Sequence, residues 1–318
     1  MFKQNSYIIV GDFLLKKGNT MAHIGVWMYH NGGGAKIEKK LVERLEKRGH
    51  RVTTGLNLRH AVAENGRMLL GDLDLYELDL FFSYNAGEQT KYQVYMYEQL
   101  DRHIPCLNNF QAFSISEDKF KTNDLLRKAS INTAEYFLCH REDIETIRQK
   151  VLEWGKAVFK TVDGWGGMGM ALVDSKDKLD MILPFLNQTD LRFFYIEKFI
   201  DYDGSDYRID LVDGEFIACY GRKAKDGDWR TNVTSGGSVI LRECDDEVIE
   251  LAKQAAKAID IEIAGVDIIY DREHEEYVVL EVNGIPAFAT PEQEAMGLDF
   301  NDKKIEAIVK LIDKRIEL

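Results

Sequence analysis

The chain has 318 residues, of which 45% are hydrophobic and 30% are charged, an ordinary composition for a globular protein with a large core. Its formal net charge of −13 argues against a general nucleic-acid binder, because a phosphate backbone requires an excess of Lys and Arg. No run reaches the ~18 apolar residues of a membrane span, and the four cysteines form no C-x-x-C pair. We therefore expect a cytoplasmic protein that binds neither nucleic acid nor membranes.

The first 115 residues predict an N-terminal extension and a small α/β domain. Residues 1–20 lack a cleavable signal pattern, because charges interrupt their short apolar patches. A domain over 21–115 follows, with predicted strands at 24–29 and 80–84 and predicted helices at 36–48 and 92–100. Strands that alternate with helices predict a parallel sheet.

From Glu117 onward the pattern predicts mainly antiparallel sheets. Two apolar segments alternate around tight turns, at Asp213-Gly214 and at 271–276, and read as hairpins. Further elements are predicted as helices at 118–128, 142–154, 245–259 and 302–316 and as strands at 134–138, 157–162, 170–173 and 193–200. The predicted fold class is α/β and α+β, with a parallel α/β domain followed by antiparallel sheets.

A glycine-rich loop, DGWGGMGM at 163–170, follows the strand that ends near Lys160. Its glycines satisfy G-x-G-x-x-G, but the dinucleotide fingerprint requires a helix that opens within the loop, and here the chain returns to a strand. The pattern favours a flap whose backbone N–H groups cover phosphates, as in protein kinases. The alternatives are a plain surface hairpin, and for Lys160 an ordinary surface lysine.

Four cations stand within nine residues of this acidic chain: Arg222, Lys223, Lys225 and Arg230. Such a group focuses anions locally, and Arg230 and Asn232, two residues apart, can face the same way. Arg208 in the neighbouring hairpin strand can join them. A solvated charged loop is the alternative.

The segment VVLEVNGIPA at 278–287 places a carboxylate and a carboxamide in an apolar strand. Glu281 and Asn283 share one face because side chains alternate, and a buried carboxylate is costly unless paired, hydrogen-bonded or bound to a metal. Asp267 lies on the partner strand of the same hairpin. Oxygen ligands of this kind suit magnesium. A buried Glu paired with an Arg is the alternative.

From Glu117 to the C-terminus the sequence resembles ATP-grasp ligases, and among them the RimK-type α-L-glutamate ligases. The segments that carry the resemblance occur in order: SEDKFKTNDLLRKASINTAEYF, VFKTVDGWGGMGMALV, YIEKFID, GSDYRIDLVDGEFIACYGRKAKDGDWRTNVTSGG and AGVDII…LEVNGIPAF. The segment before them is similar to the pre-ATP-grasp domain of that family. The resemblance implies a pre-ATP-grasp domain at 21–115, a central and lid subdomain at 116–200, and a C-terminal subdomain with a metal site at 201–318.

The resemblance also implies an ATP site. The phosphates would be contacted by Lys119 and Lys160, with Gly166 and Gly167 of the flap. The adenine would lie beside Glu197, Lys198 and Phe199, and the ribose beside Asp206. The γ-phosphate or acyl phosphate would be contacted by Arg230 and Asn232. Asp267, Glu281 and Asn283 would hold one or two Mg²⁺ or Mn²⁺ ions.

The implied reaction transfers the γ-phosphoryl group to a carboxylate, and an amine then attacks the acyl phosphate to form an amide. We assign Arg208, Arg222 and Arg230 to the charge that develops in this reaction. The donor would be glutamate or another amino acid, the acceptor a small molecule, a peptide or a protein terminus, and the protein a homodimer or homotetramer. Phosphotransfer to a hydroxyl and a non-catalytic nucleotide-binding module are the rival functions.

The sequence departs from the family where Asn-Ala-Ser-Pro-Gly often follows the metal-binding Glu. Here the segment is Asn283-Gly-Ile-Pro-Ala287, and related Asn-x-x-Pro forms occur in ligases that act on small molecules. The departure weakens the case for ribosomal-protein glutamylation and leaves the three predicted metal ligands intact.

Overall fold

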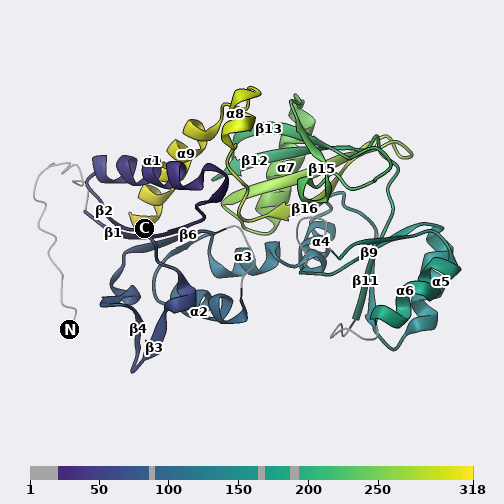
Figure 1. Cartoon of the computed structure of the whole chain (residues 1–318), viewed down its shortest axis with the longest axis horizontal. Coiled ribbons are helices and arrows are strands. Elements are labelled where there is room, and N and C mark those ends of the chain that lie inside the picture. Colours follow the sequence, from purple (N-terminus) through teal and green to yellow (C-terminus); the bar gives the residue numbers. More distant parts are fainter. Residues whose placement is uncertain (1–20, 86–89, 164–168, 187–192, 318) are drawn as a thin grey trace, which may run out of the picture.

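The N-terminal part of the chain forms a parallel sheet in the order β2-β1-β6-β7 (Figure 1). The computed structural model describes residues 21–85, 90–163, 169–186 and 193–317. The strands are β1 (His23–Met28), β2 (Arg51–Thr53), β6 (Leu80–Tyr84) and β7 (Cys106–Leu107). All five residues of β6 are buried, as expected for a parallel strand covered on both faces. The parallel sheet predicted from the sequence is therefore confirmed.

Helices cover this sheet, and a small meander extends from it. Helix α1 (Gly34–Lys47) buries Ile37, Leu41 and Leu45 at helical spacing. Helix α2 (Lys91–Asp101) buries Met96, Tyr97 and Leu100 in an apolar cluster that also contains Phe81 of β6. The meander, which the sequence analysis missed, has strands β3 (Val62–Glu64), β4 (Arg67–Leu70) and β5 (Leu73–Asp74).

An antiparallel sheet in the order β10-β9-β11-β8 forms a separate lobe with two helices (Figure 1). Its elements are β8 (Tyr136–His140), α5 (Ile144–Trp154), β9 (Ala157–Lys160), β10 (Ala171–Val173), α6 (Lys176–Leu186) and β11 (Phe193–Lys198). Helix α6, with Pro184 inside it, was not predicted. Strands β9 and β11 end two residues earlier than predicted.

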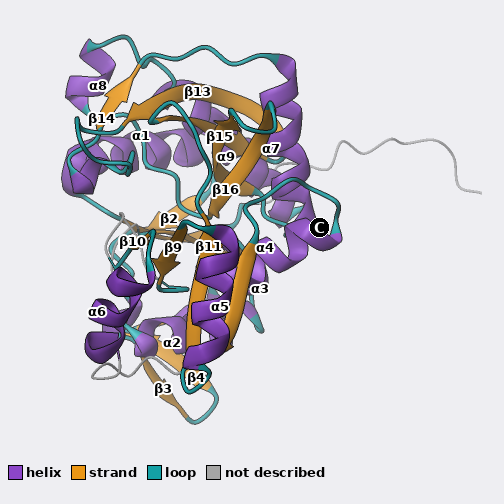
Figure 2. Ribbon diagram, turned by 90° about the vertical axis from the view of Figure 1, so that its right-hand side faces the viewer, coloured by secondary structure: helices purple, strands orange, loops and turns teal. Residues whose placement is uncertain are grey.

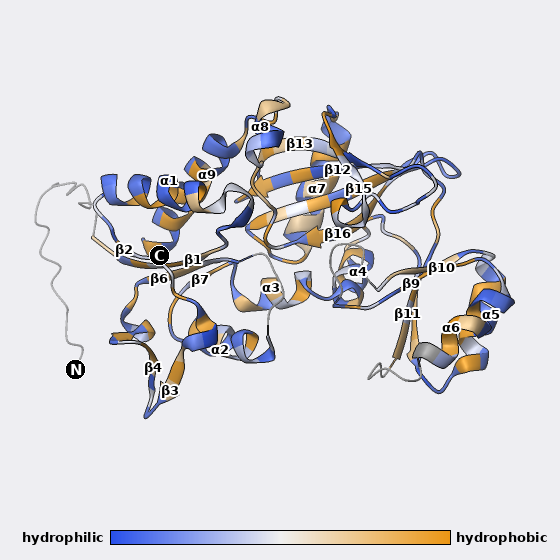
Figure 3. Ribbon diagram, in the orientation of Figure 1, coloured by the Kyte–Doolittle hydropathy of each residue, from blue (hydrophilic) through white to orange (hydrophobic). Residues whose placement is uncertain are grey.

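The C-terminal part contains a five-stranded antiparallel sheet in the order β14-β13-β12-β15-β16. The strands are β12 (Ser205–Val212), β13 (Glu215–Lys223), β14 (Ser238–Ile240), β15 (Ile263–Asp271) and β16 (Glu276–Asn283). Both predicted hairpins are confirmed. Helix α7 (Asp246–Ala258) packs on one face through Val248, Ala252 and Ala255. Polar and apolar residues alternate along β12 (Figure 3), so the opposite face carries the polar side chains.

Four further helices join these parts. Helix α3 (Phe110–Ser116) leads into α4 (Lys119–Lys128), which contacts both β8 of the lobe and β16 of the five-stranded sheet (Figure 2). After the short α8 (Pro291–Ala295), α9 (Asn301–Ile316) returns to pack along α1.

One apolar cluster runs from the parallel sheet to helix α9. It includes Val26, Phe82, Ile305 and Ile312, so the N-terminal sheet shares its core with the end of the chain. The predicted limits of the three domains stay predictions. Among the residues that the structure describes, no helix combines the length and apolarity needed to cross a membrane.

Candidate active site

The registers of three neighbouring strands bring the predicted metal ligands together. Asp267 on β15 stands opposite Arg208 on β12 and opposite Glu281 on β16. Gly265 stands opposite Asn283, so Asp267, Glu281 and Asn283 lie on one face of the sheet. The register therefore agrees with the predicted placement of the three residues on one face, and their role as metal ligands stays a prediction.

A β-bulge in this hairpin shapes the face. The register shifts between Asp267 and Ile268, and Val279 and Val282 both pack into the core on the α7 side. The two residues between them, Leu280 and Glu281, are therefore free to reach the site face. Simple alternation along the strand could not have predicted this for Leu280.

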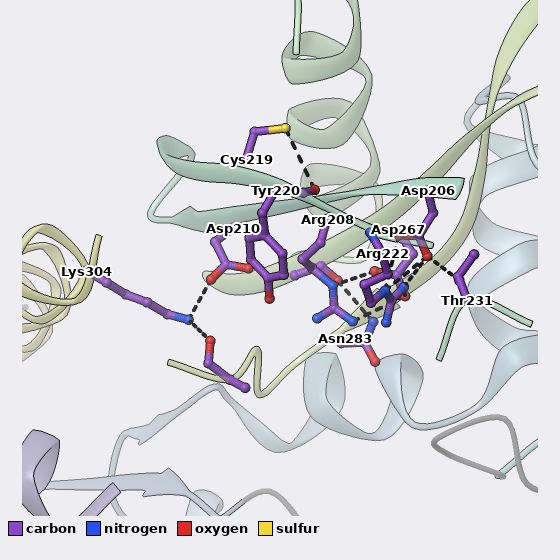
Figure 4. Close-up of polar contacts among 12 residues, drawn as sticks. Asp206, Arg208, Asp210, Cys219, Tyr220, Arg222, Thr231, Asp267, Asn283 and Lys304 are labelled. Carbon is purple, nitrogen blue, oxygen red and sulfur yellow. Dashed lines mark hydrogen bonds and ion pairs between the residues drawn. The ribbon is translucent and has the colours of Figure 1, made fainter. Parts of the chain in front are cut away.

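Asp267 is held between two arginines whose side chains are each 11% exposed (Figure 4). Its Oδ1 lies 2.5 Å from Arg208 Nε, and its Oδ2 lies 2.7 Å from Arg222 Nη2. Burial alone would raise the pKa of Asp267, but the two guanidinium groups outweigh it and hold the pKa below its ordinary value. Asp267 is thus a carboxylate at neutral pH, paired with two guanidinium groups.

Asp206, two residues before Arg208 on β12, completes this cluster. It is fully buried, and its carboxylate accepts hydrogen bonds from the Arg222 guanidinium, at 2.6 Å, and from the Thr231 hydroxyl, at 2.5 Å. The contacts of Asp206 orient Arg222. The sequence analysis expected Asp206 to lie beside a ribose. That expected contact stays a prediction.

Lys119 and two glutamates form a second charged group beside the cluster. Lys119 is the first residue of α4. Asp118 caps the N-terminus of this helix, because its side chain accepts a hydrogen bond from Lys121 N. Its Nζ lies 3.2 Å from Glu281 Oε1. Burial, reinforced by the charge of Glu281, raises the pKa of Glu117 to about 7. The sequence analysis missed Glu117, because nothing in a sequence signals that its side chain stands beside another carboxylate.

The raised pKa of Glu117 predicts a pH-dependent stability. As pH rises from about 4.5 to about 7, the unfolded chain loses the Glu117 proton first, so the native state loses stability. Because Glu117 as a residue is exposed, solvent screening keeps this loss well below the ~3 kcal/mol of a fully buried group. We expect Glu117→Gln to remove that loss. Urea unfolding with a chelator present, at the two ends of this range, measures it. Glu276→Gln, which changes an exposed glutamate, is the control. If the unfolding free energy of Glu117→Gln changed with pH as much as that of wild type and of the control, the raised pKa would not belong to Glu117.

An apolar pocket lies where the lobe meets the five-stranded sheet. Its lining residues come from both parts of the chain: Ala134, Val158, Lys160, Glu197, Lys198, Phe199, Ile200, Tyr202, Trp229, Ile269 and Leu280. Phe199 meets Trp229 edge-on at 6.2 Å between ring centroids. The sequence analysis missed Tyr202, Trp229 and Leu280 as pocket residues.

Polar groups stand at one end of this pocket. Glu197 is buried, forms an ion pair with Lys160, and accepts hydrogen bonds from Tyr195 Oη at 2.9 Å and Asn123 Nδ2 at 3.2 Å. The structure therefore places Lys160 and Glu197 together, as a charged pair. Lys198 lines the pocket, but its Nζ pairs with Glu135 at 3.0 Å.

The remaining predicted residues lie on the connection between β13 and β14 or in the flap. The Arg230 guanidinium pairs with Asp228 at 2.8 Å, and Asn232 precedes a short turn over Val233–Ser235. Lys223 is exposed. Gly166 and Gly167 lie outside the described residues.

The oxygen atoms at the sheet face fit a magnesium site. Within the described residues, Asp267 Oδ1 is buried and receives no hydrogen bond. Its close contact with Arg208 Nε is an ion pair whose geometry is not that of a hydrogen bond. Asn283 Nδ2 donates to Gly265 O at 3.2 Å, which fixes the orientation of its amide. Among these residues, no three His, Cys, Asp or Glu side chains form a metal cluster. Two carboxylates and one amide suit an ion that keeps water and phosphate ligands.

Comparisons with known proteins point to one family. The family model described as a RimK-like ATP-grasp domain matches residues 116–308. A probable alpha-L-glutamate ligase of Hydrogenovibrio crunogenus is 26% identical over 258 residues, which cover 78% of this chain and 83% of the relative. The ribosomal protein bS6–L-glutamate ligase of Escherichia coli O81 is 27% identical over 202 residues, covering 64% and 66%.

A solved structure extends the likeness to the fold of the whole chain. The RiPP-associated ATP-grasp ligase of Chryseobacterium gregarium, in complex with ADP and a leader and core peptide, has a TM-score of 0.65 at 14% identity. The match covers 92% of this chain and 96% of that one. It therefore includes the N-terminal parallel sheet as well as the region of the family model.

Proposed function

Because the chain belongs to the RimK-like ATP-grasp family of ATP-dependent carboxylate–amine ligases, we propose that it adds glutamate to the amino group of a peptide or small-molecule acceptor. The observation that carries this proposal is the single sheet face on which Asp267, Glu281 and Asn283 meet the guanidinium groups of Arg208 and Arg222. Carboxylate activation by ATP needs both kinds of group, because anionic phosphate and carboxylate oxygens must approach each other.

The nucleotide is proposed to lie along the line from the apolar pocket to this face. Phe199, Trp229 and Leu280 would enclose the adenine, and Lys160 and Lys119 would neutralise the phosphates. Gly166 and Gly167 would cover the phosphates from the flap. Pairing with Glu197 and Glu281 keeps the two lysines in place before ATP arrives.

The chemical step is proposed to occur beside Arg208 and Arg222. The donor carboxylate attacks the γ-phosphorus, the bond to the β-phosphate oxygen breaks, and ADP leaves. The acceptor amine then attacks the acyl carbon, the bond from that carbon to the phosphate oxygen breaks, and phosphate departs with one donor oxygen and the proton that the amine loses. Arg208 and Arg222 stabilise the developing negative charge, since Asp206 and Asp267 already orient them. Asp267, Glu281 and Asn283 would hold one or two magnesium ions, which supply charge neutralisation at the phosphates when bound.

Glutamate is proposed as the donor because both relatives reported above carry it in their names. The acceptor is proposed as a peptide or a small molecule rather than a ribosomal protein, since the segment after Asn283 departs from the family pattern. Arg230 and Asn232 remain proposed contacts of the γ-phosphate or acyl phosphate, and a homodimer or homotetramer remains the proposed assembly.

A hydroxamate screen tests this function. Hydroxylamine replaces the natural amine and traps an acyl phosphate, so the purified protein with ATP, magnesium and one amino acid at a time should form a hydroxamate with glutamate. A hydroxamate with a different acid would contradict the donor. Phosphorylation of a hydroxyl compound, with no hydroxamate from any acid, would contradict the ligase function itself.

Lys160→Met should weaken nucleotide binding. The substitution keeps the length of the side chain and removes the charge beside the buried Glu197, so we expect ATP to bind about tenfold or more weakly, the effect of one charge-assisted contact. Isothermal titration with a non-hydrolysable ATP analogue measures this. Lys178→Met, which removes an exposed lysine paired with Asp174, is the control. Equal affinity in all three proteins would remove Lys160 from the phosphate site.

A further inference from the structure

A lysine of the last helix lies at the core of the molecule. Lys304 on α9 has no exposed surface. Its Nζ donates to Asp210 Oδ2 at 2.8 Å, to Pro286 O at 2.8 Å and to Ala287 O at 3.2 Å, which uses all three protons of an ammonium group. The ring centroid of Phe288 lies 4.6 Å from the same nitrogen. A methionine would fill this space without the cost of burying a charge, so the directed bonds are the specific contribution of the lysine.

Those bonds hold the segment that follows the predicted metal ligand Asn283. Segment 284–289 is also tied to the parallel sheet, because Tyr84 Oη donates to Pro286 O at 2.5 Å and Phe288 N donates to Tyr29 Oη at 3.0 Å. Asn301 bonds both backbone groups of Ala289 at 2.9 Å. The N-terminal sheet and α9 therefore fix this segment from two sides.

The segment in turn bounds the position of Arg208. An added Cβ at Gly265 would lie 2.6 Å from Arg208 Nη1 and 2.6 Å from Pro286 Cβ. The guanidinium group and the proline ring thus meet over the one residue of β15 that has no side chain. A shift of Pro286 opens space into which the guanidinium group can move.

Asp210 connects the lysine to Arg208 along β12. Arg208 and Asp210 are two positions apart on β12, so they lie on the same face of the strand. Figure 4 shows Asp210 between Lys304 and Arg208. Burial would lower the pKa of Arg208, but the charge of Asp267 and, more weakly, that of Asp210 raise it. Asp210 therefore lies close enough to act on the guanidinium electrostatically.

From these contacts we infer that Lys304 and Asp210 are positioning residues that fix segment 284–289 and, through it, the Arg208 guanidinium for the transfer step. The inference rests on the proposed ligase function. The apolar nucleotide pocket lies at the other end of β15, where Ile269 and Leu280 line it. Loss of Lys304 should therefore change turnover and leave nucleotide binding alone.

The test compares Lys304→Met, Lys304→Met/Asp210→Asn and wild type by turnover, by titration with a non-hydrolysable ATP analogue, and by amide hydrogen exchange. We expect faster exchange over 285–290, an unchanged rate over 195–200, unchanged affinity for the analogue, and a fall in kcat of about 10²-fold, the size expected for a misplaced catalytic group. The double variant no longer leaves a buried carboxylate unpaired, so it should regain stability without regaining kcat.

Tyr84→Phe provides a milder variant in case the lysine variants do not fold. It removes one bond to Pro286 O and should lower kcat several-fold, whereas Tyr92→Phe, which loses a bond to Ala61 O far from the segment, should not. Unchanged exchange over 285–290, or an unchanged kcat despite faster exchange, would overturn the inference, as would a double variant with full kcat. An inactive wild type would instead overturn the proposed function, and the exchange measurement would still decide whether Lys304 holds the segment.

Discussion

Replacing Glu281 with alanine should lower turnover by about 10³-fold, comparable to the loss of one preorganised charge contact in a transition state. Glu281 lies opposite Asp267 in the register and contacts Lys119, so its removal takes one oxygen ligand from the proposed magnesium site. The fold should persist, because Lys119 still has the charges of Glu197 and Glu117 nearby.

The control for this variant is Glu276→Ala, which removes an exposed glutamate from the same strand. Turnover is measured across a magnesium titration, and circular dichroism checks the fold. Near-native turnover of Glu281→Ala, or a magnesium requirement equal to that of wild type, would remove Glu281 from the metal site.

Asp267→Asn should destabilise the protein by about 3–5 kcal/mol and abolish turnover. The substitution leaves the guanidinium groups of Arg208 and Arg222 buried close together without the carboxylate that separates them. Removing one partner of a buried ion pair has costs of this size.

An exposed ion pair supplies the matched comparison for Asp267. Asp201 and Arg272 pair at 2.7 Å with more than half of each side chain exposed, so Asp201→Asn should cost no more than about 1 kcal/mol. Urea unfolding of both variants measures the difference. An Asp267→Asn variant as stable as Asp201→Asn would mean that the cluster contributes little to the fold.

The site could be predicted from the sequence where local geometry determines it. Alternation along one strand places Glu281 and Asn283 on the same face before any coordinates are known. The turn alone does not add Asp267 to that face, because its register continued without a break would set Asp267 opposite Leu280; the bulge sets it opposite Glu281. Arg208 was predicted only as a member of the cationic group, and its place opposite Asp267 follows from the pairing of β12 with β15. Helix α1 was predicted for a similar reason, since Ile37, Leu41 and Leu45 follow the helical period.

Long-range packing determined what the sequence did not reveal. The pocket combines Trp229 and Leu280 with a strand of another sheet, and Lys304 meets Asp210 across 94 positions of the chain. The bulge before Ile268 breaks the alternation on which the strand prediction relied. The Asn65-Gly66 turn is different, because both residues have positive φ and Asn-Gly is a strong local hairpin signal. It was available in the sequence and was overlooked.

Transfer of oxygen from the donor carboxylate to phosphate tests the central claim most directly. Glutamate labelled with ¹⁸O in its carboxylates is turned over with ATP, magnesium and hydroxylamine, and the released phosphate is examined by mass spectrometry. Activation as an acyl phosphate predicts one ¹⁸O atom in each phosphate. Unlabelled phosphate, or label found in AMP, would contradict the assignment of this site to carboxylate activation by γ-phosphoryl transfer.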